Sequence, residues 1–227
     1  AIGEGYRYFY DAAERLRRFR LLCNNDGPDL VLHLGDFVET AHEDSYDLFT
    51  SQWNQIQGEK ELVVGNHDFS GSVTHDYVVE RLGYSLRPKV ARSVFNRSFS
   101  VSNGSVSVRV LMIDGQINDE GQHTSLGIGR LQSDALNWIS QELSNAPEPI
   151  ILLCSHYGPQ TQFFNPTEAA QLRERVFANA IHRGKVVHHL FGHNHGVRAA
   201  LAWSQFSNNY LGFLFPAMVD FPQAQFS

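Results

Sequence analysis

Cysteine is scarce in this chain of 227 residues, which contains only two, Cys23 and Cys154. Cys23 lies in an amphipathic helical pattern and Cys154 in the apolar run IILLCSH. Both are therefore predicted to be free thiols in the core. Two cysteines in such surroundings do not indicate the disulfide framework of a small secreted scaffold.

Positive charge is also in short supply. The chain has 18 lysines and arginines against 24 aspartates and glutamates, which gives a formal net charge of −6. Such a balance provides no basic field that would gather nucleic acid by counterion release, so broad nucleic-acid binding is not expected. A local metal cluster could still attract a single phosphate group.

Long apolar runs and linkers are missing as well. No run reaches the roughly 18 apolar residues of a membrane-spanning helix, so we expect a soluble protein, either cytoplasmic or secreted with its leader removed. The absence of internal repeats and of Gly/Ser/Pro-rich tracts favours one domain over residues 1–227. The ends, AIGEGYRYFY and FPQAQFS, are typical of a domain that is truncated at both sides.

Five short apolar runs have the length of strands. They are DLVLHLGD (29–36), ELVVGNHD (61–68), SVRVLMIDG (107–115), PIILLCSHYG (149–158) and VVHHLFGHNHG (186–196). Their apolar character is nearly continuous, which predicts strands that are buried on both faces. Three histidines within these runs are interpreted as core or sheet-flank residues: His33, His188 and His189.

Segments of helical periodicity alternate with these runs. They cover roughly residues 6–22, 45–57, 72–82, 130–145 and 167–183. Residues 94–113 differ, because two strand patterns flank Asn103-Gly104, a pair that favours a hairpin turn. The whole pattern predicts a layered α/β fold with a mixed sheet.

Four of the five runs end in glycine or a small residue followed by a side chain that can bind metal. These ends are Gly35-Asp36, Gly65-Asn66-His67-Asp68, Ser155-His156 and Gly192-His193-Asn194-His195. Open α/β sheets bind their ligands at the carboxyl ends of strands, so we expect the four ends to meet at one rim. In an extended segment His193 and His195 would face the same side, and each could bind a different ion. Ligands of this kind, without cysteine, suit zinc, manganese or iron(II) in a catalytic site.

Taken in order, these blocks resemble the calcineurin-like metallophosphoesterases, whose signature is D-x-H, G-D, G-N-H-[DE], a strand-end histidine and G-H-x-H. The segment LGIGRLQSDALNWISQEL (126–143) is also similar to that family. The resemblance implies a four-layer αββα arrangement and two divalent metal ions, and it implies these metal ligands: Asp36, Asn66, His156, His193 and His195. It further implies that Asp36 bridges the two ions, and that His67 lies beside the substrate with Asp68 orienting it.

The D-x-H block of that signature is missing from the chain. Glu4 and Asp11 do not replace it, since neither follows an apolar strand. We expect that a first strand carrying this block precedes the sequence. The alternative is a protein that binds only one metal ion well.

The predicted function is metal-dependent hydrolysis of a small phosphorylated substrate, with a nucleotide as one candidate. The bond would be a phosphomonoester, a phosphodiester or a nucleotide pyrophosphate. Two ions about 3.5–4 Å apart can hold a water between them and lower its pKa from about 15.7 to near 7, so no protein base is required. The alternative is a catalytically weakened phosphate-binding or scaffold relative. His123 lies in a loop near the expected cleft and is the candidate substrate contact, whereas Asp114 is interpreted as a turn or cap residue.

Overall fold

The helices of this protein lie on the two outer sides of a pair of facing sheets. The computed structural model describes residues 12–123, 125, 127–159, 162–193 and 202–215. Its α-helices are α1 (Ala12–Asp26), α2 (Glu43–Trp53), α3 (His75–Arg81), α4 (Ser133–Asn145) and α5 (Pro166–Asn179). Two short 3-10 helices, η2 (His67–Phe69) and η3 (Ile181–Arg183), complete the set within those residues.

The strands form two sheets. In the smaller sheet, β1 (Leu30–Leu34) pairs in parallel with β2 (Glu59–Val63). The larger sheet has the order β3-β4-β5-β6-β8-β7 and consists of β3 (Arg97–Ser102), β4 (Ser107–Ile113), β5 (Ile150–Ser155), β6 (Val186–Phe191), β7 (Ala202–Ser207) and β8 (Tyr210–Leu214). The strands β4, β5, β6 and β8 run parallel, and the edge strands β3 and β7 are antiparallel to their neighbours. The predicted mixed sheet is therefore confirmed.

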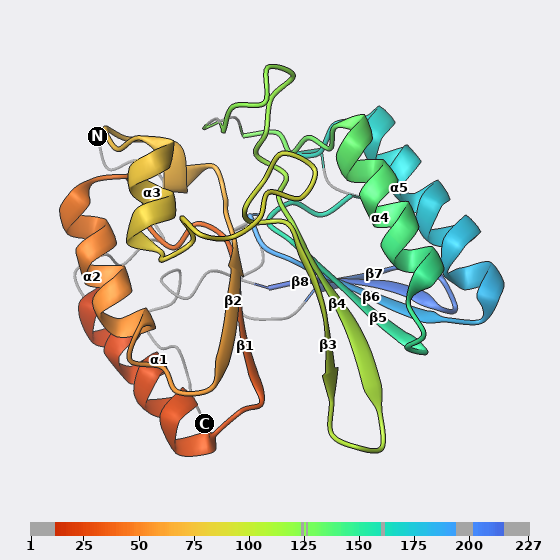
Figure 1. Cartoon of the computed structure of the whole chain (residues 1–227), viewed down its shortest axis with the longest axis horizontal. Coiled ribbons are helices and arrows are strands. Elements are labelled where there is room, and N and C mark those ends of the chain that lie inside the picture. Colours follow the sequence, from red (N-terminus) through yellow and green to blue (C-terminus); the bar gives the residue numbers. More distant parts are fainter. Residues whose placement is uncertain (1–11, 124, 126, 160–161, 194–201, 216–227) are drawn as a thin grey trace.

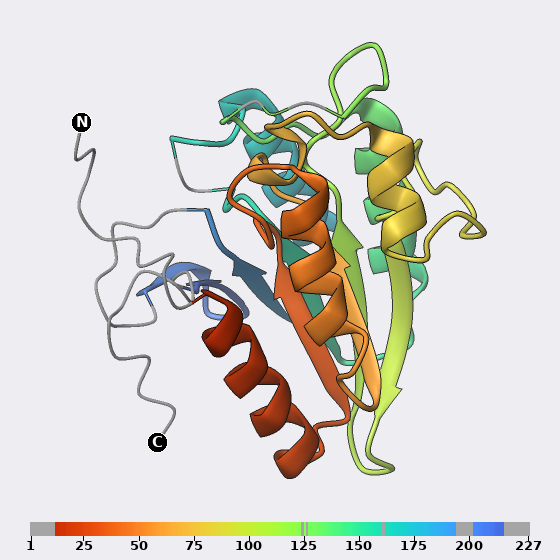
Figure 2. The same ribbon diagram turned by 90° about the vertical axis from the view of Figure 1, so that its left-hand side faces the viewer.

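Four layers result from this arrangement, as Figure 1 shows. Helices α1, α2 and α3 cover the outer face of the small sheet, and α4 and α5 cover the outer face of the large one (Figures 1 and 2). The inner faces meet in an apolar cluster that includes Val63 of β2, Met112 of β4 and Cys154 of β5. Strands in this position are buried on both sides, which explains their continuous apolar character.

Local signals in the sequence account for several of these elements. The Asn165 side chain accepts hydrogen bonds from the backbone N–H groups of Thr167 and Glu168, and Pro166 occupies the first turn of α5. At the hairpin, Gly104 has a φ of 86°, and Asn103 Oδ1 accepts hydrogen bonds from the backbone N–H groups of Ser105 and Val106. Both expectations are confirmed.

The two cysteines are free and buried, as predicted. Burial raises the pKa of both the Cys23 and the Cys154 thiols. A high thiol pKa disfavours the reactive thiolate, so these residues act as small apolar side chains in the core. None of the described helices combines the length and the apolar character needed to cross a membrane.

The strands β1 and β6 end just before candidate metal ligands, at Leu34 and Phe191. After β1, Gly35 and Asp36 take φ angles of 88° and 53°. After β6, His193 takes a φ of 68°. The extended conformation predicted through residue 193 is therefore wrong, because the backbone turns into the left-handed region at this histidine. His195 lies outside the described residues.

Candidate metal centre

The centre is built on two glycine turns at one edge of the small sheet. Since β1 and β2 are parallel, Gly35 and Gly65 follow them at the same edge. A Cβ atom added to Gly65 would lie 2.7 Å from the Asp36 backbone nitrogen and 2.8 Å from His156 Cε1. One added to Gly35 would lie 2.6 Å from His156 Nδ1. Only glycine lets the two loops and the histidine ring come this close.

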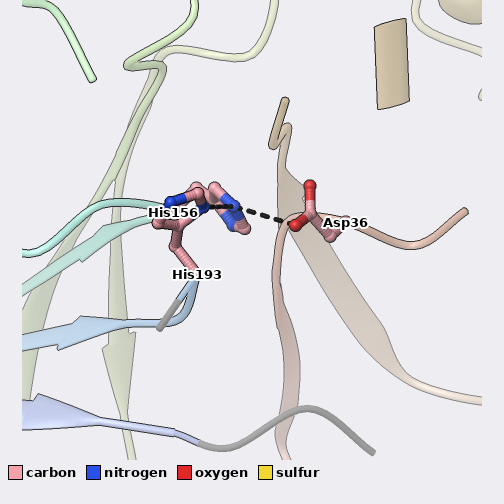
Figure 3. A group of neighbouring side chains, drawn as sticks. All are labelled: Asp36, His156 and His193. Carbon is pink, nitrogen blue, oxygen red and sulfur yellow. Dashed lines mark hydrogen bonds and ion pairs between the residues drawn. The ribbon is translucent and has the colours of Figure 1, made fainter. Parts of the chain in front are cut away.

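Three of the predicted ligands meet at this edge. Ligand atoms of Asp36, His156 and His193 all lie within 4.8 Å of one another. The Nε2 atom of His156 is 3.1 Å from Asp36 Oδ2 and 3.1 Å from His193 Nδ1. Figure 3 shows the two rings and the carboxylate facing one another across the gap between the sheets. The convergence predicted from strand ends is thus present for these three residues.

The hydrogen bonding of His156 favours a cation at this point. Its Nδ1 is 2.7 Å from the Leu34 carbonyl oxygen, which only accepts, so Nδ1 carries the proton. In the neutral ring Nε2 then presents a lone pair to Asp36 Oδ2. That oxygen is buried and has no hydrogen-bond partner among the described residues. A metal ion between these atoms satisfies both of them, and a carbonyl on the far ring nitrogen is the usual second partner of a metal-binding histidine.

The spacing of these atoms also fits a metal ion. Bonds of about 2.0–2.1 Å at angles of about 90–110° place neighbouring ligand atoms about 2.9–3.4 Å apart. The two separations of 3.1 Å fall within that range. One carboxylate and two imidazoles suit a divalent transition metal better than calcium or magnesium.

Asp36 is held in its charged form. Burial alone would raise its pKa, but electrostatic attraction to the His156 and His67 side chains and the hydrogen bond from the His67 backbone N–H outweigh burial and lower the pKa to about 2. Its Oδ1 atom accepts from the His67 backbone N–H at 3.0 Å. The carboxylate is therefore ionised at neutral pH and can serve as a ligand.

The Asp68 side chain connects the loop that follows β1 with the loop that follows β2. Its Oδ2 accepts from the backbone N–H groups of Asp36 (3.0 Å) and Gly65 (2.8 Å), and its Oδ1 accepts from that of Val38 (3.2 Å). The side chain is fully buried. Burial and the nearby charge of Asp36 raise the pKa of Asp68, while these three N–H groups oppose that shift.

The His67 ring lies against Glu39. Its Nδ1 lies 2.7 Å from the Glu39 carbonyl oxygen and 3.6 Å from Glu39 Oε2. The carboxylate of Asp68 accepts from backbone N–H groups, and its expected role in orienting His67 stays a prediction. The His67 side chain is 25% exposed and reaches the surface of the centre.

Asn66 lies beside Tyr157, a residue that the sequence reasoning missed. The Tyr157 hydroxyl donates to Asn66 Oδ1 at 3.2 Å. The Tyr157 ring packs against those of His193 and His156, with ring centroids 4.4 and 4.9 Å apart. Its position next to His156 in the sequence was the available signal.

His123, the predicted substrate contact, is paired with a buried carboxylate. Its Nε2 lies 2.6 Å from Asp114 Oδ2, and the two side chains are 4% and 0% exposed. The ring also packs on Phe69 and His75, with centroids 4.8 and 4.6 Å apart. Asp114 is more than a turn residue, since its carboxylate also accepts from Ser93 Oγ at 2.6 Å. The ion-pair contact and the aromatic packing cover most of the His123 side chain, and its role as a substrate contact stays a prediction.

The fold has four layers, and one carboxylate and two histidines meet at its strand ends. Both features are typical of α/β proteins that bind metal ions between two sheets. The sequence profile of the calcineurin-like phosphoesterases matches residues 5–197. The chain belongs to this family, as the resemblance of its motifs implied. Membership implies divalent metal ions as cofactors.

Two curated relatives match the chain at low sequence identity. The chain is 23% identical over 129 residues to a probable cyclic nucleotide phosphodiesterase of Psychrobacter sp. (strain PRwf-1), a match that covers 57% of this chain and 35% of the relative. It is 22% identical over 132 residues to a probable glycerophosphodiester phosphodiesterase of Arcobacter nitrofigilis, covering 58% and 42% respectively. The chain thus spans less than half the length of the curated relatives it matches.

A solved structure shares the fold. The crystal structure of a dimetal phosphatase from Danio rerio matches with a TM-score of 0.72 and 14% sequence identity. The match covers 95% of this chain and 81% of the phosphatase chain. At this identity the likeness concerns the architecture alone.

Proposed function

We propose that this protein hydrolyses phosphate esters with the help of bound divalent metal ions. The observation that carries the proposal is the His156 ring, whose Nε2 faces both Asp36 Oδ2 and His193 Nδ1 at 3.1 Å. With Nδ1 committed to a carbonyl, this arrangement calls for a cation. The first ion would take Asp36, His156, His193 and the amide oxygen of Asn66.

We also propose that a second metal ion binds beside the first. The resemblance of the motifs and the dimetal phosphatase of similar fold both support a pair of ions, taken from manganese, zinc or iron. Asp36 would bridge them, and His195 would belong to the second. When bound, such ions supply a water molecule of lowered pKa and offset the negative charge of the phosphoryl oxygens.

His67 is the residue proposed to act on the leaving group. Its Nδ1 is engaged by the Glu39 carbonyl, which leaves Nε2 as the ring nitrogen that can reach a substrate oxygen. Its backbone N–H is bonded to Asp36 Oδ1, so the ring is fixed relative to the metal ligand. A proton on Nε2 would pass to the departing oxygen as the bond to phosphorus breaks.

The names of the relatives support a phosphodiester as the substrate. Both curated relatives are described as probable phosphodiesterases, one for cyclic nucleotides and one for glycerophosphodiesters. The protein of similar fold is described as a phosphatase, which keeps a monoester as the second candidate. A small substrate with a single phosphoryl group at the centre accommodates both.

Metal analysis combined with hydrolysis assays tests this function. The purified protein, supplied with Mn²⁺ or Zn²⁺, is expected to retain metal and to cleave bis(para-nitrophenyl) phosphate faster than para-nitrophenyl phosphate. Asp36→Ala should lose metal and activity together, whereas Asp29→Ala should keep both. Asp29 is an exposed carboxylate just before β1, at the opposite end of that strand from Asp36.

Two results would change the assignment. Full metal stoichiometry in Asp36→Ala would contradict the proposed role of that carboxylate. Bound metal without turnover of either ester would instead favour the phosphate-binding scaffold.

A further inference from the structure

Tyr157 touches three of the proposed ligands at once. Its ring packs on those of His156 and His193, and its hydroxyl donates to Asn66 Oδ1 at 3.2 Å. The side chain is fully buried. A buried tyrosine in this position can do more than fill space, because its hydroxyl donates to the Asn66 amide oxygen and so holds the amide in one orientation.

The Asn66 amide needs such a selection. Its two terminal atoms, oxygen and nitrogen, have nearly the same shape, and the final torsion of an asparagine side chain has two broad minima. One orientation presents the oxygen, which can bind a metal ion, and the other presents an NH₂ group, which cannot. An amide oxygen has two lone pairs, so it can accept from the Tyr157 hydroxyl and still bind an ion.

Tyr157 is rigid enough to impose that choice. A Cβ atom on Gly129 would lie 2.6 Å from Tyr157 Cδ2, so the ring lies directly against the backbone of the neighbouring loop. The Tyr157 carbonyl accepts from Ser155 Oγ at 2.7 Å. Ser155 Oγ is in turn 2.7 Å from Nε2 of the buried His189. Both the ring and the backbone of Tyr157 are therefore held in place.

We propose that Tyr157 is a positioning residue that holds the Asn66 amide with its oxygen toward the metal ion. The inference rests on the proposed metal site, which it deepens by naming a residue that acts through one ligand. Removing a partner that orients a metal ligand typically costs about 10- to 100-fold in metal affinity. The same loss is expected when the Tyr157 hydroxyl is removed.

A double-mutant cycle with Asn66→Asp tests this role. Aspartate has the shape of asparagine but two equivalent oxygens, so either orientation presents an oxygen. Tyr157→Phe alone should weaken Mn²⁺ binding, measured by titration calorimetry, by about 10- to 100-fold. In the Asn66→Asp background the same change should alter the affinity by no more than about twofold, the usual limit for independent effects.

Tyr84→Phe is the matched control. Tyr84 is also buried, but its ring packs against Phe95 and under the Arg87 guanidinium, away from the proposed ligands. This variant should bind Mn²⁺ as the wild type does. Circular dichroism of each variant establishes that the fold is retained.

The other outcomes would refute either the role of Tyr157 or the metal site itself. Wild-type affinity in Tyr157→Phe, or an equal loss in both Asn66 backgrounds, would refute the positioning role. A Tyr157→Phe protein that lost its fold would assign the hydroxyl to stability and would refute it as well. If the wild type bound no Mn²⁺, or if Asp36→Ala bound it equally well, the metal site itself would be wrong, independently of Tyr157.

Discussion

Replacing Gly65 with alanine tests how closely the loops of the metal centre must approach each other. The new Cβ atom would lie 2.7 Å from the Asp36 backbone nitrogen and 2.8 Å from His156 Cε1, and it would also meet the Asp36 carboxylate. Unbonded carbon atoms rest about 3.5 Å apart or more, so the His156 ring must move by about 0.7 Å. The Asp36 carboxylate lies closer still to the new atom and must move further. Two proposed ligands are displaced by one methyl group.

The size of the effect follows from the cost of overpacking, which is about 1–3 kcal/mol for an added methyl group in a tightly packed site. If this cost falls on the metal-binding arrangement, the affinity for a divalent ion drops roughly 5- to 140-fold, at about 1.4 kcal/mol per factor of ten. In that case the loops relax when no metal is present, and the free energy of unfolding of the metal-free protein stays near that of the wild type. If the loops cannot relax, the cost lowers that free energy instead.

Two measurements on the purified variant distinguish these cases. Titration calorimetry with Mn²⁺ gives the affinity, and denaturant unfolding in a chelator gives the stability of the metal-free fold. Gly127→Ala is the control, because a Cβ atom at Gly127 would meet nothing within 4 Å. A Gly65→Ala protein with wild-type affinity and wild-type stability would refute the reasoning that only glycine fits there.

Three further predictions concern residues around the centre. His67→Ala should keep its metal content and slow ester hydrolysis, and loss of metal would argue against a role on the leaving group. Asp68→Ala should lower the free energy of unfolding, measured in denaturant, by about 3 kcal/mol or more, because three backbone N–H groups lose their acceptor. A variant that hydrolyses esters slowly but unfolds like the wild type would instead favour a role of Asp68 in orienting His67. Burial lowers the pKa of His189 to about 3, below the value of about 6.5 expected in the unfolded chain, so the neutral ring stabilises the fold at neutral pH and this contribution is lost as pH falls below about 6.5. Wild type should therefore lose up to about 2.7 kcal/mol of stability between pH 6.5 and 4.5 that His189→Gln does not, and equal pH slopes in the two unfolding series would contradict this.

The sequence predicted the layered fold and much of the centre because both depend on local patterns. Continuous apolar runs identify strands that are buried on both faces, and the rule that ligands gather at strand ends brings Asp36 and His156 together although they are distant in sequence. The hairpin at Asn103-Gly104 and the cap of α5 were likewise encoded locally.

The remaining details depend on contacts that no local pattern contains. The left-handed backbone of Asp36 and His193 is unusual outside glycine, and for His193 the sequence predicted an extended conformation. The burial of His123 follows from its pairing with Asp114, a contact within the segment between β4 and α4 that no helix or strand pattern predicts. The role of Asp68 depends on two loops that are adjacent only in the folded chain.

The division of the ligands between the two sheets has a consequence for stability. Asp36 follows a strand of the small sheet, whereas His156 and His193 follow strands of the large one. An ion that joins them fastens the halves of the sandwich to each other, and at a free concentration of about 100 times its Kd it adds about 2.7 kcal/mol to the folded state. The melting temperature should then rise with metal concentration and report occupancy directly, without any substrate.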